Sequence, residues 1–230
     1  MFAYNPQPLT KPGLPRLANR QTLHLLLAFV CGFVAITGGL FVYQKTARPT
    51  MPPPDLPILW PNPKQIHEFA LHDQQGVDFD LERVKGKWTF WFFGYTHCPD
   101  ICPITLSVMN EVDSKLASRP ALRELTQTVF VSVDPARDTA SRLGQYVRFF
   151  NADFVGATAS DEDLSALARQ FGILYLLQPA DDAGDYLVDH TAGVLLTDPQ
   201  ARFVAVFSAP HSADTVNEQF RQIEAFITDQ

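Results

Sequence analysis

Two cysteines with three residues between them are the strongest candidates for chemistry in this chain. Cys98 and Cys102 come directly after residues 88–93, an apolar and aromatic run that is followed by a glycine and predicts a buried strand. Asp100 is a good helix N-cap residue, and Pro103 falls in the first turn, where its missing N–H costs nothing. The pattern therefore places Cys102 in the first turn of a helix and Cys98 in the loop before it.

The start of a helix suits a reactive cysteine pair. Free backbone N–H groups and the helix dipole stabilise a thiolate there, and thiolates are ligands for soft metals. A structural disulfide is the simpler alternative, but a bridge across three residues closes so small a loop that it stabilises little. Thioredoxin-type exchange sites have two intervening residues rather than three. The spacing leaves both a redox site and a metal site open.

Copper(I) accepts two or three thiolate and imidazole ligands, so one histidine from elsewhere would complete a site. His190 is the leading candidate, because it lies on an expected turn between two short strands, and loops commonly carry function. His97 adjoins Cys98, but neighbours in an extended segment point to opposite sides. The remaining candidates are expected at the surface, with a capping role as a further reading of the last: His67, His72 and His211.

The elements that must position these side chains alternate along residues 64–230. Residues 69–71 and 77–81 flank a turn, Asp73–Gly76, and predict a hairpin. Buried strands are expected at 88–93 and 129–133, and shorter ones at 173–177, 186–188, 194–197 and 203–207. Helices are expected from Asp100 to before Pro120, and over 138–150, 160–171 and 212–227. This order predicts an α/β fold, a thioredoxin-like sandwich with a central mixed sheet and flanking helices.

The N-terminal quarter predicts a membrane anchor. Residues 23–43 are apolar enough for a single transmembrane helix of roughly 30 Å, and Cys31 within it is expected to be a plain small apolar residue. Residues 1–22 are basic and predict a cytoplasmic tail, which leaves the rest of the chain outside the cytoplasm. Residues 44–63 are proline-rich and predict an extended linker to the domain at 64–230.

Composition narrows the class of protein. The chain has 230 residues, enough for one core of ordinary size, and a formal net charge of -7 from 18 basic and 25 acidic residues. Because phosphate contacts need basic clusters, which the sequence lacks, we expect no nucleic-acid partner.

Three motifs in this order resemble the Sco/SenC family of copper chaperones. They are FGYTHCPDICP from Phe93, VSVDPARDT from Val131 and VDHT from Val188, and the resemblance covers about residue 65 to the C-terminus. It implies a thioredoxin-like domain that binds one copper ion through Cys98, Cys102 and His190. It also implies that Asp134 supports the ligands or caps a helix, although a turn cap before a proline would explain this residue equally well.

The resemblance also implies a role in assembling the dinuclear copper centre of cytochrome c oxidase subunit II, as copper donor, as thiol reductant through Cys98 and Cys102, or as both. The expected protein is a metallochaperone rather than an enzyme, with subunit II, other copper chaperones or thiol reductases as partners. The N-terminus lacks the Arg- and Ser-rich character of a transit peptide, which favours a bacterial inner membrane with the domain in the periplasm over a mitochondrial inner membrane.

Three alternatives stay open at this point. A membrane-tethered thiol–disulfide oxidoreductase would need the two cysteines but not His190. A peroxiredoxin-like peroxidase is a weaker fit, because it would use a lone cysteine in a threonine-bearing loop, whereas Thr96 lies only two residues before Cys98. A copper-responsive signalling protein would keep all three ligands and differ only in what its loss does to the cell.

Overall fold

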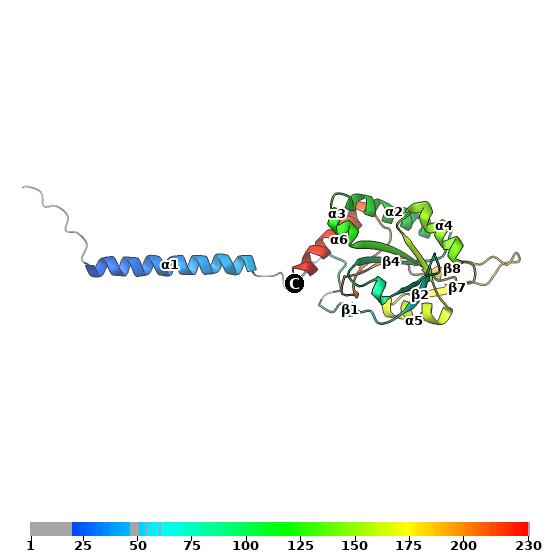
Figure 1. Cartoon of the computed structure of the whole chain (residues 1–230), viewed down its shortest axis with the longest axis horizontal. Helices are drawn as coiled ribbons and strands as arrows, with labels where there is room; N and C mark the ends of the chain where they lie inside the picture. The colour runs from blue at the N-terminus through cyan, green and yellow to red at the C-terminus, as the bar shows by residue number, and fades with distance from the viewer. Residues whose placement is uncertain (1–19, 47–50, 54, 60, 230) are drawn as a thin grey trace, which may run out of the picture. The chain divides into compact units, whose positions relative to one another are not determined.

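A computed structural model describes residues 20–46, 51–53, 55–59 and 61–229 of the chain. The chain divides into two compact units, residues 1–48 and residues 49–230. The first unit contains the helix α1 (Arg20–Thr46), which is drawn as one continuous helix in Figure 1. Its residues 23–41 have a mean hydropathy of 2.1, so the helix is long and apolar enough to cross a membrane. Most of the expected cytoplasmic tail lies outside the described residues.

The second unit is built on a mixed sheet in the order β1-β10-β9-β4-β5-β6-β2-β3. The central strand β4 (Trp88–Gly94) pairs in parallel with β5 (Thr126–Ser132), which pairs in parallel with β6 (Val155–Thr158). All other neighbours in this sheet are antiparallel, namely β1 (Lys64–Gln65), β2 (Ala70–Asp73), β3 (Asp78–Asp80), β9 (Val194–Thr197) and β10 (Arg202–Phe207). The predicted mixed sheet is therefore confirmed.

Every side chain of β4 is buried, because helices cover both faces of the sheet. Trp91 and Phe93 pack on the face covered by α5 (Asp161–Phe171). Phe90 and Phe92 point the opposite way, as alternate residues of a strand must, and pack under α2 (Ile101–Leu116), α4 (Ala140–Phe150) and α6 (Ala213–Thr228). Figure 1 shows α5 below the sheet and the other three helices above it.

Short elements account for most differences from the predicted secondary structure. The strand β6 was not predicted, because Val-Gly-Ala-Thr is too short and too weakly apolar to stand out. The expected helix after Asp100 ends at Leu116, and a separate short helix, α3 (Pro120–Glu124), begins with proline in its first turn. A single 3-10 turn (Leu81–Arg83) follows β3. The α5 helix begins as predicted, with the Ser160 hydroxyl accepting from the Asp163 N–H at 3.2 Å.

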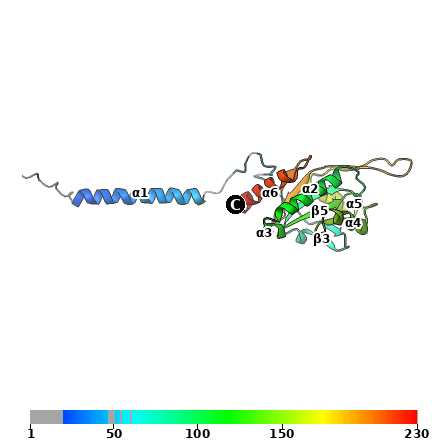
Figure 2. The ribbon, with the colours of Figure 1, turned by 90° about the horizontal axis from the view of Figure 1, so that it is seen from above.

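The domain contains two β-hairpins that can be compared with the predicted strands. The first, β2 with β3, pairs around the predicted turn. The second joins β7 (Tyr175–Leu177) and β8 (Val188–His190) in a separate two-stranded sheet, and Figure 2 shows the loop between them projecting from the domain. The expected strand at 186–188 is displaced by two residues to 188–190. The loop before it contains a turn, in which Asp181 accepts the backbone N–H groups of Ala183 and Asp185. As a result His190 ends a strand rather than occupying a turn.

Part of the expected linker joins the domain. Leu59 donates its N–H to the Val204 carbonyl at 2.6 Å, and Val206 donates to the Pro57 carbonyl at 3.0 Å. Leu56 and Ile58 pack against the core on the α2 side of the sheet. Residues 56–59 therefore run along β10 as an added edge instead of forming a free tether.

Candidate metal centre

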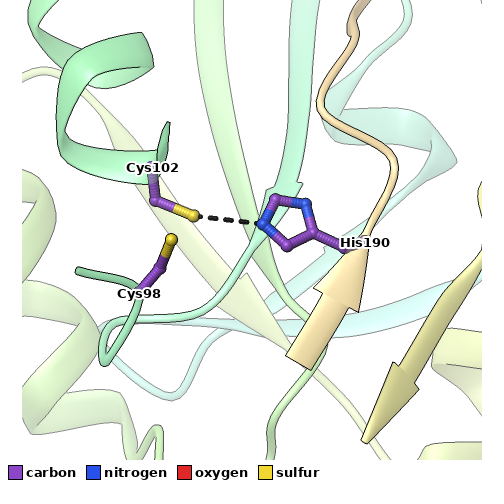
Figure 3. A group of neighbouring side chains, drawn as sticks. All are labelled: Cys98, Cys102 and His190. Carbon is purple, nitrogen blue, oxygen red and sulfur yellow. Dashed lines mark hydrogen bonds between the residues drawn. The ribbon is translucent and has the colours of Figure 1, made fainter. Parts of the chain in front are cut away.

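Cys98, Cys102 and His190 meet at one end of the sheet, as Figure 3 shows. The two sulfurs and an imidazole nitrogen all lie within 4.8 Å of one another. The Cys102 Sγ is 3.4 Å from the His190 Nε2, and neither cysteine is in a disulfide. The side chains come from the loop after β4, the first turn of α2 and the end of β8. Two thiols and an imidazole at these separations can converge on one metal ion.

The sequence around β4 makes room for the buried sulfur. Cys102 is fully buried, and a Cβ atom built on Gly94 would lie 2.7 Å from its Sγ and 2.9 Å from the Phe130 ring. Real Cβ atoms essentially never approach other heavy atoms so closely, and hence only glycine lets the strand pass beneath α2 here.

The start of α2 differs from the expected cap. Asp100 occupies the N-cap position, but its side chain makes no capping hydrogen bond. Instead, the backbone N–H groups of Asp100 and Cys102 contribute to lowering the pKa of Cys98. The free N–H groups at the start of α2 thus favour a thiolate there, as expected for a cysteine at a helix start.

The two thiols have unequal acidity. The pKa of Cys98 is lowered, first by a hydrogen bond from Cys102 and then by His190 and the two backbone N–H groups. The pKa of Cys102 is raised, because its proton is held in the hydrogen bond to Cys98 and because the side chain is buried. The metal-free pair therefore consists of a partly exposed thiolate and a buried thiol. Because a cysteine binds a metal as its thiolate, a metal held by both sulfurs would displace the Cys102 proton.

His190 presents its Nε2 to the two sulfurs. Its Nδ1 lies 3.2 Å from the Thr191 carbonyl, which assigns the ring proton to Nδ1 and leaves the Nε2 lone pair free. The ring is fixed edge-on against Phe92 and Tyr95, with 6.0 Å between ring centres in each pair. The imidazole is therefore fixed with its Nε2 directed toward the two sulfurs.

Asp134 contacts the hairpin that carries His190 through Tyr186. Its buried carboxylate accepts the Tyr186 hydroxyl at 2.8 Å and the Arg137 Nε at 2.5 Å, and the Arg137 guanidinium stacks 3.5 Å from the Tyr186 ring. Its carbonyl also accepts the N–H groups of Arg137 and Asp138, which makes the turn after β5. Because Tyr186 belongs to the hairpin that carries His190, the Asp134 side chain holds that hairpin while its backbone forms the turn.

Asp138 also contacts the Cys98 loop. It lies in the motif VSVDPARDT, but no role was predicted for it from the sequence. Its fully buried carboxylate accepts the Thr96 N–H at 2.8 Å, the Thr96 hydroxyl at 2.5 Å and the Ser132 hydroxyl at 2.6 Å. Its position could have indicated this role. Asp138 follows the second buried strand, and the carboxyl ends of neighbouring parallel strands meet at one edge of a sheet.

The other histidines lie apart from the ligand group. His97 points to Asp138, with 3.6 Å between Nδ1 and Oδ1, which agrees with the predicted orientation away from the metal. His67 and His72 are exposed as expected. His211 is half-buried rather than superficial, because its Nε2 contacts the Ala192 carbonyl at 2.9 Å, and its Nδ1 has no hydrogen-bond partner among the described residues.

Comparison with known proteins gives consistent relationships. The SCO1/SenC family model matches residues 61–225. The mitochondrial SCO2 homolog of Mus musculus is 36% identical over 160 residues, covering 69% of this chain and 62% of that protein. A Stutzerimonas stutzeri protein is 36% identical over 167 residues, covering 72% of this chain and 80% of that protein. The chain spans about six tenths of the length of the mouse and bovine relatives, 62% and 58% respectively.

Two solved structures with copper bound share the fold. ScoI of Arabidopsis thaliana superposes with a TM-score of 0.64 at 32% identity and covers 69% of this chain and 98% of that one. ScoI of Bradyrhizobium japonicum gives 0.62 at 31% identity, with 69% and 99% covered. These likenesses confirm the thioredoxin-like sandwich predicted from the sequence. With the family motifs and the fold in agreement, the chain belongs to the SCO1/SenC family.

Proposed function

We propose that this protein is a membrane-anchored copper chaperone that holds one copper ion between Cys98, Cys102 and His190. The observation that carries the proposal is the convergence of the three ligand atoms within 4.8 Å of one another. Two thiolates and one imidazole match the soft, low-coordinate preference of copper(I). Because Cys98 and His190 are only half-buried, a partner can reach an ion held there.

The copper is cargo in this proposal, and its recipient is the dinuclear copper centre of cytochrome c oxidase subunit II. Membership of the SCO1/SenC family supports that assignment. Transfer would proceed by exchange, with thiolates of the recipient replacing the three ligands one at a time. Another copper chaperone would reload the site. The open side of a three-coordinate ion allows such an exchange without prior release of copper into water.

The anchor fits the same proposal. We place residues 23–43 across a bacterial inner membrane, with residues 1–22 in the cytoplasm and the domain from residue 64 in the periplasm. The basic N-terminal tail and the apolar α1 helix support this orientation. A mitochondrial inner membrane is the alternative location.

Copper titration of the full chain in detergent tests the metal site. The protein would be reduced and anaerobic, with Cys31 replaced by alanine so that only the site thiols remain, and would compete with a chromophoric copper(I) chelator. We expect one copper per chain, and an affinity at least about tenfold lower in His190→Ala, since each lost ligand weakens the site. His72→Ala, which removes an exposed histidine paired with Asp78 at 3.0 Å, serves as the matched control. Equal affinity in the two variants would remove His190 from the site.

Cells lacking the protein test the recipient. Loss of oxidase activity that returns with the unchanged chain but not with His190→Ala would support copper delivery. Normal oxidase activity with only a lost response to copper would support the signalling alternative instead.

A second function is favoured by the unequal thiols, namely reduction of the recipient's cysteines. The Cys98 thiolate would attack a disulfide sulfur of the target and release one target thiolate. The Cys102 sulfur, after losing its proton, would attack the mixed disulfide, release the second target sulfur and close a Cys98–Cys102 disulfide. Two electrons and the Cys102 proton pass to the target, and the other target thiolate takes its proton from water. A Cys102→Ser variant should stop at the mixed disulfide with the target. If non-reducing gels showed no such mixed disulfide, this activity would be contradicted.

A further inference from the structure

A buried carboxylate, that of Asp138, ties the loop that carries Cys98 to the sheet. We propose that Asp138 is the positioning residue that holds the Cys98 loop in its metal-binding conformation before copper arrives. The inference rests on the proposed copper site and deepens it, because it names the group that fixes one ligand without touching the ion.

The carboxylate is placed to bind the loop from two directions. One oxygen accepts the Thr96 N–H and the Ser132 hydroxyl, at 2.8 and 2.6 Å, so it joins the loop to the end of β5. The other accepts the Thr96 hydroxyl at 2.5 Å. Arg142 of α4 adds to the same residue by donating its Nε to the Thr96 hydroxyl at 2.8 Å. Thr96 is therefore held by three hydrogen bonds to two residues outside its own loop, Asp138 and Arg142.

The loop is short enough for this restraint to reach the sulfur. Cys98 follows Thr96 by two residues, and its N–H donates to the Tyr95 carbonyl at 3.2 Å, closing a tight turn. Gly94, on the other side, is bound through its carbonyl to the Val133 N–H at 2.9 Å. A shift of Thr96 must therefore move the Cys98 sulfur, because the chain between them has no slack.

Loss of the carboxylate would leave the loop without an acceptor. Asp138 is fully buried, and the Thr96 N–H and hydroxyl bond to no other described acceptor closer than the His97 ring nitrogen at 3.4 Å. Buried donors without partners are costly, so the loop would turn outward to water. Such a movement would carry Cys98 away from Cys102 and His190, which are anchored on α2 and β8.

The chain contains a matched control in Asp198. That carboxylate is also fully buried, and it accepts the Gln200 N–H, the Arg202 N–H and the Arg202 Nε, at 3.1, 2.8 and 2.6 Å. It follows β9, which runs antiparallel to β4 with Thr197 opposite Thr89. Asp198 therefore lies at the opposite end of these strands from the metal centre. Replacing it removes an equivalent set of hydrogen bonds without disturbing the ligands.

The experiment compares Asp138→Ala and Asp138→Asn with Asp198→Ala and Asp198→Asn in the full chain, in detergent and in the Cys31→Ala background. Thr96→Val provides a further variant if Asp138→Ala does not fold, because it removes only the hydroxyl. Copper(I) affinity, the thiolate-to-copper(II) absorption band and urea unfolding would be measured for each. In the metal-free protein, the rate at which oxidised glutathione closes the Cys98–Cys102 disulfide gives a readout independent of copper.

We expect the Asp138 variants to lose at least about tenfold in copper affinity, to shift the absorption band and to close the disulfide more slowly. The Asp198 variants should stay within about twofold of the unchanged chain on all three measures at a similar loss of stability. Equal losses in both sets, or unchanged copper binding in a folded Asp138→Ala, would overturn the inference. If the unchanged chain bound no copper, the proposed function would fail, and the disulfide rate alone would decide the role of Asp138.

Discussion

The two sulfurs of the site differ in protonation because their surroundings differ. The pKa of Cys98 is lowered, above all by its interaction with the Cys102 thiol and also by the first backbone N–H groups of α2. The pKa of Cys102 is raised, above all by its interaction with Cys98 and also by burial. Cys98 is thus a thiolate that can bind a metal or attack a disulfide at neutral pH, whereas Cys102 keeps its proton.

Alkylation of Cys98 by iodoacetamide measures this difference. In reduced, metal-free protein carrying Cys31→Ala, the rate should change little between pH 8 and pH 6, because a lowered pKa keeps the thiolate populated across that range. An ordinary thiol, with a pKa of about 8.5, loses about tenfold in rate for each pH unit below its pKa. The urea-unfolded chain should show that ordinary profile. The same tenfold fall in the folded protein would contradict the assignment of a thiolate to Cys98.

Gly94→Ala should affect the metal centre through packing alone. The added methyl would lie 2.7 Å from the Cys102 Sγ, so the sulfur or the strand must move. We expect a loss of about 1–3 kcal/mol in the free energy of unfolding, as in other overpacked cores, together with weaker copper binding. Gly144→Ala is the control, because its nearest contacts, at 3.3 Å, are the Arg148 guanidinium and the Gln74 Cβ rather than a cysteine. Urea titration and copper competition distinguish the two, and equal copper affinity would refute the expected displacement.

At the scale of elements, His190 comes from a hairpin outside the main sheet, whereas the cysteines follow β4, the central strand of that sheet. The strands β7 and β8 pair only with each other, and Tyr175 lies opposite His190. The hairpin is tied to the domain where the Tyr186 hydroxyl donates to Asp134. The Tyr95 ring also packs edge-on against the His190 ring, with 6.0 Å between the ring centres. These two contacts hold His190 over the start of α2.

Tyr186→Phe should loosen the hairpin while leaving the fold intact. The variant loses one hydrogen bond to a carboxylate, worth about 1.5–3 kcal/mol for charged partners, but keeps the ring that stacks on Arg137. We expect faster amide exchange in residues 178–190 and a copper affinity reduced several-fold. Tyr175→Phe, on the same hairpin, serves as the control, since the Tyr175 hydroxyl makes no hydrogen bond among the described residues. Unchanged exchange in Tyr186→Phe would show that the tie does not restrain the hairpin.

At the scale of the whole molecule, the chain separates a membrane-compatible helix from the unit that carries the site. All three ligands and both supporting carboxylates, Asp134 and Asp138, lie within residues 49–230. The large apolar side chains described for α1 are exposed. Water would not favour such a surface, so the helix needs a lipid environment or another apolar partner.

Cell fractionation tests this division. The full chain should sediment with membranes, whereas a chain of residues 49–230 should stay in the soluble fraction and bind copper with the same affinity. Arginine at both Leu27 and Val34 should release the full chain from membranes, because each charge at the centre of a span costs about 2.5–3.5 kcal/mol. Retention of the double variant in membranes would show that another part of the chain provides the attachment.

The sequence by itself determined the features that depend on near neighbours. The aromatic strand, the cysteine pair at the start of α2, the first hairpin and the apolar helix all follow from short-range patterns, and these predictions agree with the structure. About half of the helix boundaries shift by a residue or two, because ends depend on capping and packing as well as on pattern.

Only the tertiary structure decided which distant residues meet the cysteines. His190 lies 88 residues beyond Cys102 and reaches it through the pairing of β7 with β8, a register that sequence reasoning displaced by two residues. Asp138 acquires its role because β4 and β5 are parallel neighbours and end at the same edge of the sheet. Local propensity says nothing about such pairings, since they are fixed by the burial of the whole sheet between its helices. The residue types thus predicted the chemistry of the site, whereas the fold determined its geometry.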